Sequence, residues 1–89
     1  MQERAVTVSN KLGLHARAAA KFVTAASTFS SEINVVKNGQ TVNGKSIMGV
    51  MMLAASRGTE LVITTHGDDE QQAADKLENL ITEKFGEEE

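Results

Sequence analysis

The chain has 89 residues, a formal net charge of −3 at pH 7 and 40% hydrophobic residues, which suits one globular domain over residues 1–89. The absence of cysteine excludes disulfides and thiolate chemistry, while the acidic balance and scarcity of aromatic side chains argue against a nucleic acid as partner. No apolar run is long enough to cross a bilayer and the N-terminus does not resemble a signal peptide, so we expect a cytoplasmic protein with no membrane partner.

The first half of the chain is predicted to contain three strands and one helix. Residues 4–9 alternate in polarity, as a half-buried strand does. Residues 32–37 and 40–43 are predicted to pair as a hairpin, because the Asn38-Gly39 step between them favours a type I′ turn. Residues 16–27 have a helical period, and the predicted buried face consists of Ala16, Ala19, Phe22 or Val23, and Ala26.

The second half is predicted to add two helices and one strand. We expect Ser46 to cap a short apolar helix that begins at Ile47 and ends before Gly58. A strand is predicted over residues 60–65, followed by a helix that Asp69 caps through a capping box with Gln72. The predicted core face of this last helix consists of Ala73, Leu77, Leu80 and Ile81.

The predicted order of elements is therefore βαββαβα. Alternating strands indicate a sheet with one solvated face, so the amphipathic helices must cover the other face. We predict an α+β fold, an open-faced β-sandwich in which a four-stranded sheet carries three helices on one face. The periodicity does not fix the order of the strands within the sheet.

The stretch GLHARAAAKFV places His15 just before the first predicted helix. The first turn of a helix has unpaired amides and a partial positive charge, so the backbone of Ala16 and Arg17 is predicted to bind an anion. The same field favours a neutral, nucleophilic imidazole, and Arg17 is close enough to bring its guanidinium to that anion. This arrangement suits transient phosphorylation of His15. Because the sequence has no nucleotide-binding loop, the phosphoryl group must come from another protein.

Several other residues are given structural interpretations. His66 is read as a turn residue, and two histidines far apart in the sequence give no reason to expect a metal. The charges of Lys37, Lys45 and Arg57 are expected to be solvated, and the acidic GEEE tail to be a frayed, solvated end.

Two motifs, GLHARAAAKFV and NGKSIMGVMMLAA, together resemble the HPr family, the histidine-containing phosphocarriers of the bacterial phosphoenolpyruvate-dependent sugar phosphotransferase system (PTS). The resemblance covers essentially the whole chain. It implies that His15 accepts a phosphoryl group at Nδ1, as pros-phosphohistidine, from phosphoenolpyruvate-charged enzyme I and passes it to IIA components. Arg17 would stabilise the phosphate and assist docking. The implied protein is a carrier without a cofactor, not a stand-alone enzyme, and we expect a monomer.

The resemblance also implies a regulatory site and a partner surface. Ser46, in its KSIMGVM context, is implied as the target of HPr kinase/phosphorylase, and a phosphate there would repel acidic partners. The family usually has proline where this chain has Ala18, a difference expected to tune transfer rates. Exposed methionines suit a surface that meets several partners. The implied surface comprises Arg17, Lys21, Ile47, Met48, Met51 and Met52.

Other functions remain open. A nitrogen-type or purely regulatory PTS carrier would phosphorylate or bind only regulatory proteins. A small non-catalytic binding module would need clustered basic residues or exposed aromatics, which the sequence does not offer. An enzyme that used His15 as a base would need an orienting carboxylate and a substrate pocket.

Overall fold

The computed structural model describes residues 1–87, and its elements follow the predicted order βαββαβα. The strands are β1 (Gln2–Thr7), β2 (Glu32–Lys37), β3 (Gln40–Asn43) and β4 (Glu60–His66). The helices are α1 (Ala16–Ala26), α2 (Ile47–Met52), α3 (Glu70–Thr82) and a short 3-10 helix, η1 (Lys84–Gly86), which the sequence pattern did not predict.

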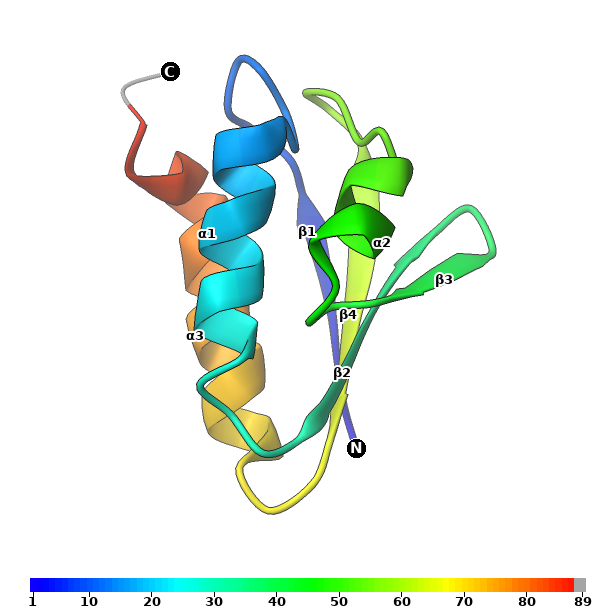
Figure 1. The fold of residues 1–89 in the computed structure, drawn as a ribbon, viewed down its shortest axis with the longest axis vertical. Coiled ribbons are helices and arrows are strands. Elements are labelled where there is room, and N and C mark those ends of the chain that lie inside the picture. The colour runs from blue at the N-terminus through cyan, green and yellow to red at the C-terminus, as the bar shows by residue number, and fades with distance from the viewer. Residues whose placement is uncertain (88–89) are drawn as a thin grey trace.

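The strands form one antiparallel sheet in the order β1-β4-β2-β3. The long strand β4 lies between β1 and β2, and the β2–β3 hairpin places β3 at one edge. The turn residues Asn38 and Gly39 have φ angles of 48° and 83°, and a type I′ turn requires positive φ at both. All three α-helices lie on the same face of the sheet (Figure 1). The predicted open-faced sandwich is therefore confirmed.

The hydrophobic core lies between the sheet and the helices. In β4 the alternate residues Leu61, Ile63 and Thr65 are buried, as a strand with one covered face requires. The buried hydroxyl of Thr65 donates to the carbonyl of Glu70 at 2.8 Å, so burial does not leave it unpaired. The helices contribute the buried residues Ala18, Ala19, Phe22, Ala26, Val50, Ala73, Ala74, Leu77 and Ile81.

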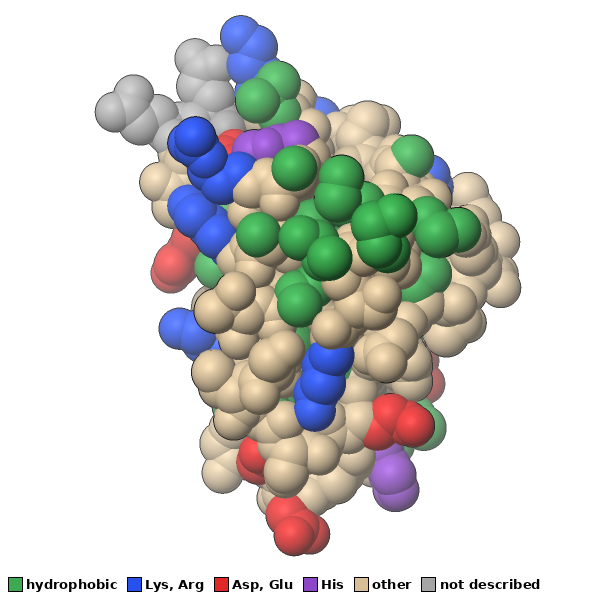
Figure 2. Space-filling view, viewed as in Figure 1, with side chains coloured by type: hydrophobic (Ala, Val, Ile, Leu, Met, Phe, Trp, Pro, Cys, Tyr) green, Lys and Arg blue, Asp and Glu red, His purple; other side chains and the backbone are tan. Residues whose placement is uncertain are grey.

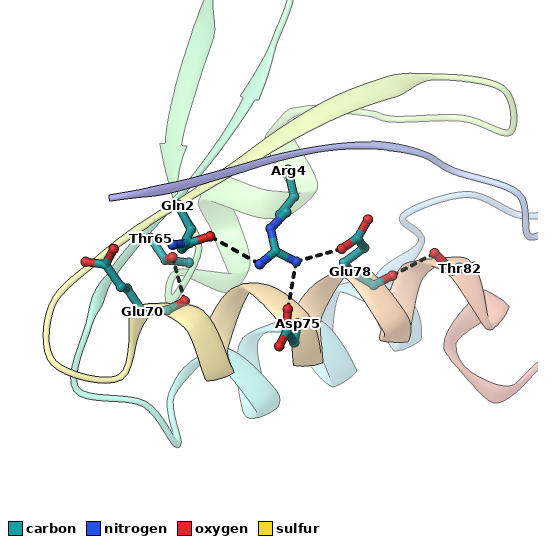
Figure 3. Close-up of polar contacts among 7 residues, drawn as sticks. All are labelled: Gln2, Arg4, Thr65, Glu70, Asp75, Glu78 and Thr82. Atoms are coloured by element: carbon teal, nitrogen blue, oxygen red, sulfur yellow. Dashed lines mark hydrogen bonds and ion pairs between the residues drawn. The ribbon is translucent and has the colours of Figure 1, made fainter.

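An ionic contact attaches the edge strand β1 to α3 (Figure 3). The Nη1 atom of Arg4 donates to Oδ1 of Asp75 at 2.7 Å and to Oε1 of Glu78 at 2.9 Å. The hydrogen bond to Asp75, followed by the one to Glu78, raises the pKa of Arg4 above its ordinary value. The contact therefore joins elements that are far apart in the sequence.

Two buried faces differ in part from the prediction. Ala16 is exposed at the start of α1, and Ala18 is buried in the core instead. The prediction failed here because periodicity cannot distinguish positions within a run of alanines. In α3 the predicted core residue Leu80 is only half-buried, whereas Ala74 is fully buried. The strand predicted over residues 4–9 begins and ends two residues earlier.

The predicted capping box at Asp69 is wrong. The carboxylate of Asp69 makes no capping bond to α3, and instead accepts hydrogen bonds from the backbone amides of Ser30, at 2.9 Å, and Ser31, at 3.0 Å. Hydrogen bonds from the Ser31 hydroxyl and the Ser30 amide lower the pKa of Asp69 to about 2. Near the start of α3, the Glu70 carboxylate accepts the Gly67 amide at 3.1 Å. Glu70 therefore binds a backbone amide before the helix, the role predicted for Gln72. Asp69 therefore stabilises the α1–β2 loop rather than the helix.

Two lysines expected to be solvated donate hydrogen bonds to carbonyls of distant segments. The Nζ atom of Lys37 donates to Leu53 at 2.8 Å, and that of Lys45 donates to Phe29 at 2.7 Å. Arg57 is exposed, as expected.

The interpretation of the acidic tail as frayed is also wrong for its first residues. Gly86 belongs to η1, and Glu87 makes the contacts described in the next section. Residues 88–89 lie outside the described residues.

Candidate functional site

His15 is the N-cap residue of α1. Its φ and ψ angles are −71° and 175°, and its carbonyl accepts the Ala19 amide at 2.8 Å, which begins the helix. Its side chain makes no capping hydrogen bond. The amides of the first turn are therefore not covered by the cap side chain, and an anion beside the ring could accept hydrogen bonds from them.

A tight contact fixes the loop that carries His15. Gly13 has a φ of +65°, and a Cβ there would lie 2.4 Å from the carbonyl oxygen of Ala55, so no side chain fits. The next amide, that of Leu14, donates to the same carbonyl at 2.8 Å. These contacts hold the loop against the segment that follows α2. The helix itself ends at Met52, and Ala54 in the following segment has a φ of 50°.

A carboxylate engages the His15 ring. The Nε2 atom of His15 lies 2.7 Å from Oε2 of Glu87. This hydrogen bond is the main reason why the pKa of Glu87 is below its ordinary value. Because an ionised carboxylate only accepts hydrogen bonds, Nε2 must donate to it, and in the neutral ring Nδ1 is then the nitrogen that carries the lone pair. Glu87 is a residue that the sequence analysis missed.

The other carboxylate oxygen of Glu87 contacts Asn10. The Nδ2 atom of Asn10 donates to Oε1 of Glu87 at 3.1 Å and to the carbonyl of Gly13 at 2.7 Å. Asn10 is fully buried, and its Oδ1 has no hydrogen-bond partner among residues 1–87. The orientation of its amide is therefore set by two acceptors, one in the His15 loop and one on Glu87.

The tail reaches His15 because Phe85 anchors it. Phe85 is buried in the core, and the chain turns sharply around it, with positive φ angles at Lys84, Phe85 and Gly86. The Nζ atom of Lys21, in α1, donates to the Phe85 carbonyl at 2.7 Å. The only sequence signal for this anchor is an apolar residue followed by glycine after the last helix. Figure 1 shows η1 beside the upper half of α1, where that helix begins.

Two predicted basic site residues lie on the exposed side of α1. Arg17 and Lys21 are both exposed, and together with Lys76 they line a shallow groove between α1 and α3. Within residues 1–87, no carboxylate pairs with Arg17. Its guanidinium is therefore not neutralised by a neighbour in this part of the chain.

An apolar patch covers the exposed side of α2. Figure 2 shows hydrophobic side chains gathered on the upper part of this face, beside basic ones. The four apolar residues of α2 predicted for the surface are 39–66% exposed, whereas Val50 is buried. Leu12, which the sequence analysis did not single out, is 67% exposed. The apolar patch consists of Ile47, Met48, Met51 and Met52, all in α2.

Ser46 is the N-cap residue of α2, as predicted. Its Oγ atom accepts the Gly49 amide at 3.1 Å. The residue is half-buried and directly precedes the exposed Ile47 and Met48. A group attached to its hydroxyl would therefore lie at the margin of the apolar patch.

The remaining candidate sites add little to this arrangement. His66 is the exposed last residue of β4 and takes no part in the His15 site. Among residues 1–87 there is no group of three potential ligands that could hold a metal ion. No helix in the same part of the chain is long and apolar enough to span a membrane.

Comparisons with known proteins agree on one family. The family model described as "PTS HPr component phosphorylation site" matches residues 2–83. Phosphocarrier protein HPr of Neisseria meningitidis serogroup A is 53% identical over 87 residues, which cover 98% of each chain. Among solved structures, HPr-C-His from Thermoanaerobacter tengcongensis has a TM-score of 0.97 and 50% identity over all of both chains. A structure described as an HPr dimer from the same organism has a TM-score of 0.79 and 50% identity, covering 98% of this chain and all of the other.

The matching motifs, the fold and the position of His15 lead to the same conclusion. The family model covers most of the chain, and the relatives match it almost from end to end. This chain belongs to the HPr family, the phosphocarriers of the PTS.

Proposed function

We propose that His15 accepts a phosphoryl group at Nδ1 from phosphoenolpyruvate-charged enzyme I and passes it to IIA components, in the cytoplasm. The observation that carries the proposal is the position of His15 as the N-cap residue of α1, where its side chain leaves the first-turn amides uncapped. The Nε2 atom of His15 is engaged by Glu87, which leaves the Nδ1 lone pair for attack. The protein would act as a transiently phosphorylated carrier rather than as a stand-alone catalyst.

The first turn of α1 would bind the phosphoryl oxygens. The amides of Ala16 and Arg17 lie at the positive end of the helix dipole, and the exposed Arg17 side chain can supply a further charged donor. Ala18, in place of the family's usual proline, adds one more amide to this turn. The site holds the group without enclosing it, since the His15 side chain is 26% exposed.

Docking would use the apolar patch together with Arg17 and Lys21. Flexible methionine side chains can adapt to different partner surfaces, and enzyme I and IIA components are different proteins. The patch is small and has basic residues beside it, which suits transient complexes with partners whose surfaces are acidic. We propose that the carrier meets each partner as a monomer.

Regulatory phosphorylation of Ser46 by HPr kinase/phosphorylase forms a second part of the proposal. Its support is the position of Ser46 at the start of α2, where a phosphate is electrostatically tolerated and its oxygens could still accept the Gly49 amide. Its negative charge would stand beside Ile47 and Met48 and would weaken docking of acidic partners.

The test is phosphorylation by purified enzyme I and phosphoenolpyruvate. Wild-type protein should gain phosphate that is labile in acid and stable in alkali, whereas His15→Ala should gain none while keeping its circular dichroism spectrum. His66→Ala is the matched control, because it removes the other, exposed histidine and should be phosphorylated normally. Phosphate on the His15→Ala protein, or none on a folded wild-type protein with active enzyme I, would contradict the proposal.

A further inference from the structure

We propose that Glu87 is a positioning residue for the reaction at His15. It holds the ring proton on Nε2, and so presents Nδ1 as the nucleophile and stabilises the cationic ring that forms on attack. This inference rests on the proposed phosphorylation of His15.

The contact is built from both carboxylate oxygens. Oε2 accepts from His15 Nε2 at 2.7 Å, and Oε1 accepts from Asn10 Nδ2 at 3.1 Å. Asn10 is fully buried, and its second amide hydrogen is used by the Gly13 carbonyl at 2.7 Å. The carboxylate is thus fixed relative to the loop that carries His15. The solvated tail that the sequence indicated would have provided no such constraint.

The backbone around Glu87 is held independently of its side chain. Phe85 is buried in the core, and Lys21 binds the Phe85 carbonyl at 2.7 Å. Lys84 and Phe85 both have φ angles of 58°, a region that disfavours side chains with a Cβ. The fold therefore maintains an unfavourable backbone conformation that brings the carboxylate to the ring. Substitutions of Glu87 should leave this anchor in place.

The chemistry uses the carboxylate without moving a proton. The Nδ1 lone pair forms a bond to phosphorus while the bond from phosphorus to the donor's leaving atom breaks, and that atom keeps the electron pair. The imidazole ring, now substituted on both nitrogens, carries a positive charge, and its Nε2–H continues to donate to Glu87. A hydrogen bond between two charged groups is stronger than one to a neutral ring, so Glu87 favours the phosphorylated state and the approach to it. In transfer to the next partner, the N–P bond breaks and its electrons return to the ring.

The test compares Glu87→Gln with Glu87→Ala. The two variants should affect the His15 ring differently, because Asn10 would orient the amide of the glutamine. Asn10 must donate to the glutamine oxygen, so the glutamine NH₂ would face the ring and donate to Nε2. Glu87→Gln should therefore move the ring proton to Nδ1 and block the nucleophile, although it is the smaller change in shape. Glu87→Ala leaves Nε2 to solvent and should give a mixture of tautomers. Glu83→Gln is the charge-matched control, since Glu83 is exposed in the same segment.

Two measurements on the folded proteins give the answer. ¹⁵N NMR of the His15 ring in the unphosphorylated proteins should report the Nε2–H tautomer in wild type and Glu83→Gln, and the Nδ1–H tautomer in Glu87→Gln. The rate of phosphoryl acceptance from charged enzyme I should fall by about 10- to 100-fold in Glu87→Ala, as expected for the loss of a charged hydrogen bond, and further in Glu87→Gln.

The outcomes separate this inference from the proposed function. If wild type accepts phosphate and both Glu87 variants accept it within about twofold of the wild-type rate, the positioning role is wrong and the carrier function stands. An unchanged tautomer in Glu87→Gln would also overturn the positioning role. A folded wild-type protein that accepts no phosphate overturns the carrier function, and the positioning role with it.

Discussion

At the scale of residues, the site combines His15, which the sequence identifies, with the carboxylate of Glu87, which it does not. His15 and Arg17 stand in a recognisable motif, two residues apart at the start of a predicted helix. Glu87 is 72 positions away from His15, in a tail whose composition indicates solvation. Only the folding of η1 against α1 brings them together, and no local pattern encodes that contact.

Arg17 is predicted to bind the phosphoryl oxygens through its positive charge and through the paired N–H donors of its guanidinium. Arg17→Ala should slow phosphoryl transfer by about 10-fold or more, because it removes a charged donor from the oxygens. Arg17→Lys should recover only part of the rate, since an ammonium cannot form the paired hydrogen bonds of a guanidinium. Stopped-flow or quench-flow transfer rates would measure both effects. The exposed Arg57→Ala is the charge-matched control, and equal slowing in that variant would point to a general charge effect.

At the scale of elements, the sequence predicts the existence and order of helices and strands better than their ends. The βαββαβα order is confirmed, and Ser46 caps α2 as expected. The cap predicted at Asp69 failed because two amides of another loop compete for the same carboxylate. Periodicity describes one element at a time, and so it cannot include such a competitor.

The Ser46 cap should contribute measurably to stability. Ser46→Ala removes the acceptor for the Gly49 amide and should lower the free energy of unfolding by about 1 kcal/mol, as is typical of N-cap serines. Urea denaturation of the unphosphorylated protein would measure the change. Ser56→Ala, in the exposed segment after α2, is the matched control and should be near neutral. A Ser46→Ala protein as stable as wild type would contradict the capping role.

Asp69 should make stability depend on pH in the acid range. Its pKa is lowered to about 2, mainly by the hydrogen bonds from Ser31 and Ser30, so the folded state favours the ionised carboxylate. Its contribution is therefore complete above the ordinary carboxyl pKa of about 4 and is lost as pH falls towards 2. Asp69→Asn should lower the melting temperature at pH 6 and bring it closer to that of wild type at pH 2. A difference that stayed constant across this range would contradict the assignment.

At the scale of the whole molecule, the fold gathers the candidate site residues at one end. The start of α1, the loop before it, α2 and η1 all lie towards the same end of the sheet (Figure 1). The apolar patch and the basic side chains of α1 share one face there (Figure 2). A partner that contacts this face can reach His15 without any opening of the core. This arrangement suits repeated loading and unloading of a phosphoryl group.

The central claim is that the phosphoryl group is carried on Nδ1 of His15. The most direct measurement is NMR of ¹⁵N-labelled protein phosphorylated by enzyme I and phosphoenolpyruvate, with ³¹P–¹⁵N coupling used to identify the bonded nitrogen. We predict coupling to Nδ1 of His15, with Nε2 still protonated beside Glu87. Coupling to Nε2, or to any atom of another residue, would contradict the account.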